Sequence, residues 1–111
     1  MILDKHVTKV ISNNVNMTVP YYLMASYAYY EKDDPILSDD FYDKLAKNIL
    51  KQWDNIEHYH KQLLSKDVLE AGSYIGKYPT IISEALKSLR KTAKKWIKMI
   101  ETLSLMQWID F

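Results

Sequence analysis

The last third of the chain constrains the fold most, because its apolar residues recur every three or four positions over more than twenty residues. This spacing places them on one side of a long α-helix. The chain of 111 residues holds two glycines and three prolines, so few positions would interrupt helices. We predict an all-α single domain over residues 1–111, with about five helices and a long C-terminal helix over 80–105. The predicted core face of that helix consists of Ile81, Ile82, Ala85, Leu86, Leu89, Ala93, Trp96, Ile97, Ile100 and Leu103.

Local signals divide the preceding residues into shorter helices. The first is expected over residues 5–12. Thr18 is expected as N-cap of a second helix that reaches about Tyr30, and this helix is apolar or aromatic around its circumference, so more than one face must be covered. Ser38 is expected to cap a third helix. The inner stripe of that helix is expected to hold Leu45, Ile49 and Trp53.

Composition narrows the classes of function. The chain has no cysteine, which excludes disulfides, zinc–thiolate sites and thiol nucleophiles. Its net charge of +1 provides no global field toward nucleic acid or an acidic membrane. The N-terminus is charged too early for a signal peptide, and no run approaches the roughly 20 apolar residues of a membrane span. We therefore expect a soluble cytoplasmic protein without membrane contact, and the excess of lysine over arginine favours a bacterial or viral source, including a phage, with the host cytoplasm as location if viral.

Residues 29–43 carry aromatic and acidic side chains on both sides of a turn that contains Pro35. Asp39, Tyr42 and Asp43 stand at i, i+3 and i+4, so they share one face of the third helix. The preceding helix ends in two further tyrosines that the turn should fold back toward this face. Aromatic faces and carboxylates suit a flat, positively charged ring such as a nicotinamidium. The alternative is that the tyrosines belong to the core and the aspartates only favour the helix start.

The same stretch resembles the N-terminal Ia domain of NAD-dependent DNA ligases, the domain that binds nicotinamide mononucleotide (NMN). The family motif runs Tyr-(Tyr/His)-x-x-Asp-x-Pro-x-x-x-Asp-x-x-Tyr-Asp-x-Leu. The resemblance covers residues 20–53, the helix-turn-helix portion. The positions in register are Tyr29, Tyr30, Asp33, Pro35, Asp39, Tyr42, Asp43 and Leu45.

The resemblance implies a ligand and a binding site. In the family this domain holds the NMN half of NAD and presents its pyrophosphate to a lysine of the adenylation domain. By resemblance, the ligand of this chain is NAD or NMN, bound through aromatic stacking and through acceptors for the ribose hydroxyls and the carboxamide. The residues that would contact the nicotinamide riboside half are Tyr29, Tyr30, Asp39, Tyr42 and Asp43.

The chain also departs from the family. It contains no Lys-x-Asp-Gly nucleophile, so we expect no self-adenylation and no enzyme activity of its own. Phe41 stands where the family is usually polar, which predicts either a more apolar pocket or a packing contact peculiar to this chain. The expected function is a stand-alone nicotinamide-nucleotide binding module, accessory or regulatory, with a protein of DNA replication or repair as partner.

Other patterns keep a second class of function open. Gly72 and Gly76 lie too close together for a phosphate loop. His58 and His60 are two positions apart, so on a helix they point to different sides, and we expect no metal site. The last helix carries a basic stripe that is either solvated surface or a contact for phosphates. The alternative function is a helical protein- or nucleic-acid-interaction protein with a vestigial pocket. The stripe consists of Lys87, Arg90, Lys91, Lys94, Lys95 and Lys98.

Overall fold

The computed structural model describes residues 2–72, 74 and 76–109, with side chains as far as Lys95. It confirms the all-helical prediction, and over these residues it contains five α-helices and no strand. Three short 3-10 turns connect them, at Val15–Met17, Trp53–Asn55 and Tyr59–Leu63. The helices are α1 (Asp4–Asn13), α2 (Thr18–Tyr30), α3 (Asp39–Lys51), α4 (Lys66–Ala71) and α5 (Thr80–Ile109).

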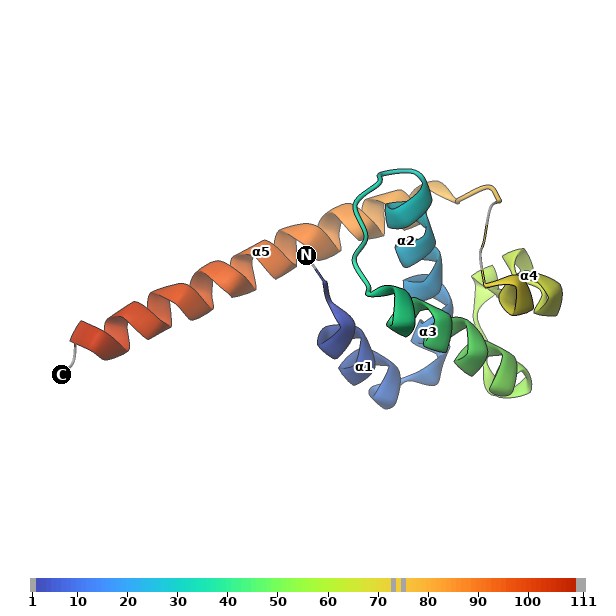
Figure 1. The fold of residues 1–111 in the computed structure, drawn as a ribbon, viewed down its shortest axis with the longest axis horizontal. Helices are drawn as coiled ribbons and strands as arrows, with labels where there is room; N and C mark the ends of the chain where they lie inside the picture. Colours follow the sequence, from blue (N-terminus) through green and yellow to red (C-terminus); the bar gives the residue numbers. More distant parts are fainter. Residues whose placement is uncertain (1, 73, 75, 110–111) are drawn as a thin grey trace.

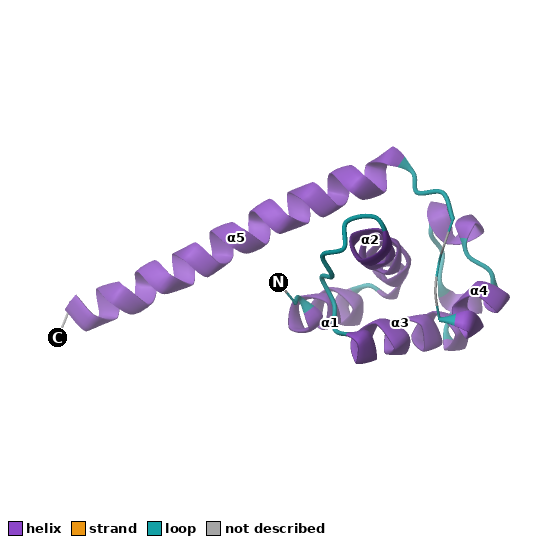
Figure 2. Cartoon of the chain, turned by 45° about the horizontal axis from the view of Figure 1, so that its top comes forward, coloured by secondary structure: helices purple, strands orange, loops and turns teal. Residues whose placement is uncertain are grey.

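Helix α2 is the centre of the fold. Figure 2 looks almost along its axis and shows α5 on one side of it, with α1 and α3 on the other. Its side chains are buried in nearly every direction, including Tyr22, Leu23 and Ala28, which are fully buried. This explains why the sequence of α2 is apolar around its circumference: only its last two residues, Tyr29 and Tyr30, are exposed to water.

Helix α5 packs its first half on the rest of the protein and then extends away from it, which gives the molecule a longest dimension of 56 Å (Figure 1). Ile82, Leu86 and Ala93 are buried as predicted, and Leu89 is half-buried. The prediction that Ile81 belongs to the core is wrong, since this residue is 62% exposed. It directly precedes the buried Ile82, so its side chain points to a different side of the helix. The side chains predicted to be core from Trp96 onward lie outside the described residues.

The two predicted N-caps have different outcomes. Ser38 caps α3 and accepts from the Phe41 N–H at 3.3 Å, as predicted. Thr18 is not an N-cap, because the preceding 3-10 turn leads straight into α2 and leaves Thr18 in helical geometry, with its hydroxyl donating to the Val15 carbonyl at 2.6 Å. Gly72 ends α4 in the left-handed conformation, with φ of 74°.

The prediction that Trp53 continues the inner stripe of α3 is wrong. The helix ends at Lys51, and Trp53 lies in the following 3-10 turn, half-buried against the core. The Lys61 ammonium lies 4.6 Å from the centre of its ring and donates to its carbonyl at 2.5 Å. Leu45 and Ile49 are buried as expected.

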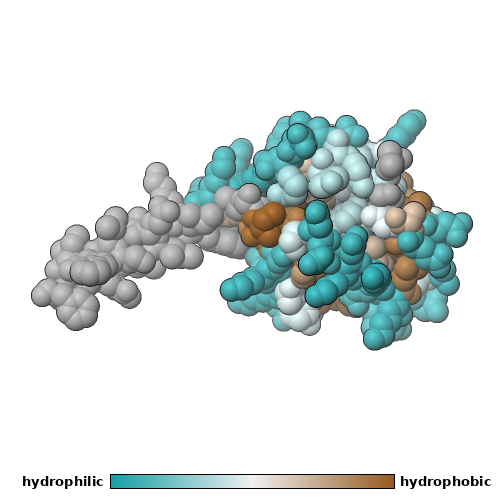
Figure 3. Space-filling model, viewed as in Figure 1, coloured by the Kyte–Doolittle hydropathy of each residue, from teal (hydrophilic) through white to brown (hydrophobic). Residues whose placement is uncertain are grey.

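The surface shows no broad apolar face in the view of Figure 3, where brown residues form small separate patches among hydrophilic ones. Among the helices of the described region, none combines the length and the hydropathy that crossing a membrane requires.

Candidate nucleotide-binding site

The turn between α2 and α3 has a backbone that suits its acidic residues. Asp33 adopts a positive φ of 49°, a conformation that aspartate and asparagine tolerate better than most residues. The Asp34 N–H donates to the Ala28 carbonyl at 2.9 Å, which ties the turn to the last residues of α2. Pro35 follows, and the chain bends at Ile36 and Leu37 before it reaches Ser38, the N-cap of α3. The turn therefore folds the start of α3 back along the end of α2.

Helix α1 fixes the start of α3 from outside. Both carboxylate oxygens of Asp4 accept from Ser38, one from its N–H at 3.0 Å and the other from its hydroxyl at 2.6 Å. The Leu3 N–H donates to the Ile36 carbonyl at 2.7 Å. Asp4 is a residue that the sequence did not single out, because its partner lies 34 positions further along the chain.

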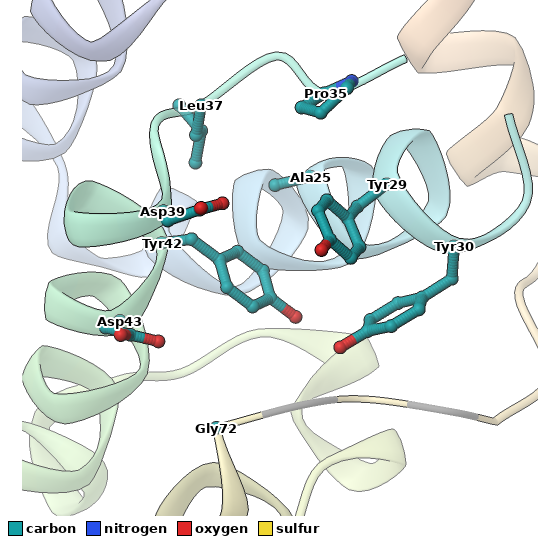
Figure 4. Close-up of a pocket in the computed structure, with 9 residues that line it drawn as sticks. All are labelled: Ala25, Tyr29, Tyr30, Pro35, Leu37, Asp39, Tyr42, Asp43 and Gly72. Carbon is teal, nitrogen blue, oxygen red and sulfur yellow. The ribbon is translucent and has the colours of Figure 1, made fainter. Parts of the chain in front are cut away.

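The structure brings together all five residues proposed from the sequence. They line one cavity of about 250 Å³ between α2 and α3. Figure 4 shows the tyrosine hydroxyls directed into the same space, with the two carboxylates on the α3 side. Among the described residues, the lining consists of Ala25, Tyr29, Tyr30, Pro35, Leu37, Asp39, Tyr42, Asp43 and Gly72.

Tyr42 is the anchored wall of the cavity. Its ring stacks on Tyr22 with centroids 4.8 Å apart and planes 10° from parallel, so one face is already covered. Its hydroxyl lies 2.6 Å from Ser26 Oγ, and Ser26 in turn donates to the Tyr22 carbonyl at 2.9 Å. Because serine has one hydroxyl hydrogen, Tyr42 must be the donor in the contact with Ser26. Burial raises the pKa of Tyr42, which therefore stays protonated at neutral pH.

Tyr29 and Tyr30 are the accessible aromatic side of the cavity. They are 48% and 40% exposed, unlike the other tyrosines of α2, which are buried or half-buried. Their rings meet edge to face, with centroids 4.9 Å apart and planes at 80°. A flat ligand entering the cavity would find these rings free of overlying protein on the solvent side.

The third side of the cavity comes from a region beyond the ligase resemblance. Gly72, at the end of α4, lines the cavity next to Asp43. A Cβ atom added at Gly72 would lie 3.8 Å from Asp43 Oδ1, an ordinary contact, so the glycine is required by its positive φ and not by a lack of space. No local pattern links the two positions, and sequence reasoning missed this contribution.

Phe41 does not line the cavity. It is half-buried, packs against the core, and borders a separate apolar hollow of about 300 Å³ between α1 and α3. Of the two alternatives raised by its departure from the family pattern, the structure supports a packing contact. The hollow is lined by Thr8, Ile11, Ser12, Phe41, Lys44, Leu45 and Asn48.

The basic stripe of α5 is divided by its contacts. The guanidinium of Arg90 donates to both the carboxylate and the backbone carbonyl of Asp34, so this cation joins α5 to the turn after α2. Lys87 lies 3.3 Å from Glu84, with both side chains exposed. Lys91, Lys94 and Lys95 are exposed, and Lys98 lies beyond the described side chains.

The two histidines have a structural arrangement. His58 Nδ1 accepts from the His60 N–H at 3.1 Å and caps the 3-10 turn that follows. Burial of the ring lowers the pKa of His58, and the neighbouring His60 lowers it further. Within the part of the chain that the structure describes, no three side chains of the metal-binding types gather around a common point.

Comparisons of the chain with models of protein families, with curated proteins and with solved structures found no match.

Proposed function

We propose that this chain is a nicotinamide-nucleotide binding module that takes NMN or NAD into the cavity between α2 and α3. The observation that supports the proposal most is the convergence of five residues chosen from the sequence alone on one cavity. Such a convergence is not required by the all-helical fold, in which tyrosines at the end of a helix can equally face a core or solvent.

The chemistry of the lining agrees with this ligand. The tyrosine rings offer stacking surfaces for the nicotinamide ring, and Asp39 and Asp43 offer acceptors for ribose hydroxyls and the carboxamide N–H groups. The cavity volume of about 250 Å³ lies below the roughly 300–1,000 Å³ typical of sites for whole drug-sized ligands. The cavity would therefore hold the nicotinamide riboside half, and the rest of NAD would remain outside.

The proposed role is accessory and not catalytic, since the chain carries no Lys-x-Asp-Gly nucleophile. It senses, sequesters or presents the nucleotide, and a protein of DNA replication or repair is the proposed partner. A rival function is a helical interaction protein with a vestigial pocket. The apolar hollow beside Phe41 and the exposed lysines of α5 favour that rival.

Calorimetric titration separates the two functions. NMN and NAD should bind saturably, whereas AMP, which lacks the nicotinamide half, should bind far more weakly. Incubation with NAD labelled in its adenylate half should leave no label on the protein. If AMP binds as well as NMN, the cavity is not a nicotinamide site, and if no nucleotide binds, the interaction-protein function is favoured.

A further inference from the structure

The charges around the cavity carry an inference about which form of the nucleotide it selects. Two of the lining residues are carboxylates, Asp39 and Asp43, and none of the described lining residues is basic. An anionic ligand group placed in this cavity would meet repulsion without a compensating cation.

Two basic side chains in the neighbourhood of the cavity, Arg90 and Lys47, lie outside its lining. Arg90 is paired with Asp34 on the α5 side of the turn. Lys47, one helical turn after Asp43, borders an adjoining hollow that shares Asp43 and Gly72 with the cavity and also contains Glu70. Neither cation lines the cavity itself.

The hydrogen-bonding groups of the two carboxylates and of Tyr42 also favour a cationic ligand. Carboxylates only accept hydrogen bonds. The single hydroxyl hydrogen of Tyr42 is used on Ser26, so toward the cavity its oxygen can only accept. The two carboxylates and the Tyr42 oxygen give the site negative charge and acceptors, whereas the hydroxyls of Tyr29 and Tyr30 can donate as well as accept. The exposed rings of Tyr29 and Tyr30 present faces that attract cations.

We propose, resting on the function proposed above, that the cavity recognises the cationic nicotinamide riboside unit itself and gains nothing from the phosphate. The preferred ligand class is an oxidised pyridinium nucleoside. The reduced dihydropyridine form, which has the same shape but no ring charge, is rejected. The 5′-phosphate of NMN, and with it the rest of NAD, lies outside the cavity. The module would therefore report the oxidised form of the nucleotide.

Three probes test this at low salt by calorimetry: nicotinamide riboside, its reduced 1,4-dihydro form, and NMN. We expect the riboside to bind at least as tightly as NMN and about tenfold or more tighter than its reduced form, the scale of a cation held over aromatic rings beside carboxylates. Affinity for the riboside should fall as salt is added.

Matched variants locate the effect. Asp39→Asn and Asp43→Asn should each narrow the gap between the oxidised and reduced ribosides, whereas Asp40→Asn, on the same first turns of α3 but outside the cavity lining, should leave it unchanged. NMN binding about tenfold tighter than the riboside, or equal affinity for the two redox forms, would overturn the inference while leaving the nucleotide-binding function in place. Absence of binding by all three probes would overturn both.

Discussion

The Tyr42 hydroxyl donates to Ser26 Oγ at 2.6 Å, and this contact holds a wall of the cavity against the central helix. Ser26 is fully buried, and its hydroxyl donates in turn to the Tyr22 carbonyl. Tyr42 is therefore fixed both by its stack on Tyr22 and by a hydrogen bond from its hydroxyl. A ligand that packs against Tyr42 meets a surface that does not have to be ordered on binding.

Replacing Ser26 with alanine should lower both stability and nucleotide affinity. The variant loses the acceptor for a hydroxyl that is partly buried, at a cost of about 1 kcal/mol in the free energy of unfolding. Ser12→Ala is a suitable control, since the Ser12 hydroxyl also donates to a backbone carbonyl of its own helix, that of Lys9, but Ser12 is exposed. Urea denaturation and NMN titration of both variants check this. Equal behaviour of the two variants would mean that the Ser26 contact does not hold Tyr42.

Removing the Asp4 carboxylate should loosen the start of α3. Asp4→Ala leaves the Ser38 N–H and hydroxyl without their acceptors, and we expect a loss of about 1–3 kcal/mol in stability. Asp67→Ala, in the first turn of α4 and exposed, controls for the loss of a helix-dipole interaction alone. Hydrogen exchange at the first amides of α3 should increase only in the Asp4 variant. Unchanged exchange there would show that the turn is held by other contacts.

The packed side of α5 can be distinguished from its exposed side by two truncations. Leu86 is 3% exposed, so Leu86→Ala should cost about 2–5 kcal/mol through lost transfer energy and a cavity. Ile81, at 62% exposed, should tolerate alanine within about 0.5 kcal/mol. Thermal and urea denaturation give both values. Similar losses of stability at the two positions would mean that α5 is rotated about its own axis relative to this structure.

The basic stripe provides a test of the rival function. If it binds nucleic acid, the binding should be independent of sequence and should fall steeply with salt, because counterions are released. Changing Lys87, Lys91, Lys94 and Lys98 to Gln should abolish it. Arg90→Gln should instead lower stability, because Arg90 anchors α5 to Asp34. If the wild-type protein causes no gel shift at low salt, the stripe is solvated surface.

Sequence patterns predicted the features that depend on neighbours along the chain. The i, i+3, i+4 spacing correctly placed Asp39, Tyr42 and Asp43 on one face, and Ser38 was recognised as a cap from its position. Long-range partners were missed: Asp4 contacts Ser38, and Gly72 completes the cavity, although neither belongs to a local motif. These depend on how the helices pack, which periodicity along one segment does not encode.

Two wrong predictions, for Thr18 and Ile81, each relied on the type of a single residue. Thr18 has the residue type of a cap, but the preceding 3-10 turn already places it inside the helix. Ile81 follows the apolar pattern, yet the side of α5 that meets α2 is narrower than the apolar side of its sequence, and Ile81 falls outside it. The neighbouring turn decided the first position and helix packing decided the second, both over the preference of the single residue.

Titration of NMN into the wild-type protein and into Tyr42→Ala, Asp43→Asn and Asp40→Asn variants tests the central claim most directly, with amide chemical shifts as readout. We expect saturable wild-type binding, with shifts concentrated at residues 25–43 and near Gly72. Tyr42→Ala and Asp43→Asn should each weaken binding by about 1–3 kcal/mol while remaining folded, and Asp40→Asn should bind normally. If NMN produces no saturable shift at millimolar concentration, or if Asp40→Asn weakens binding as much as Asp43→Asn, the cavity between α2 and α3 is not a nicotinamide-nucleotide site.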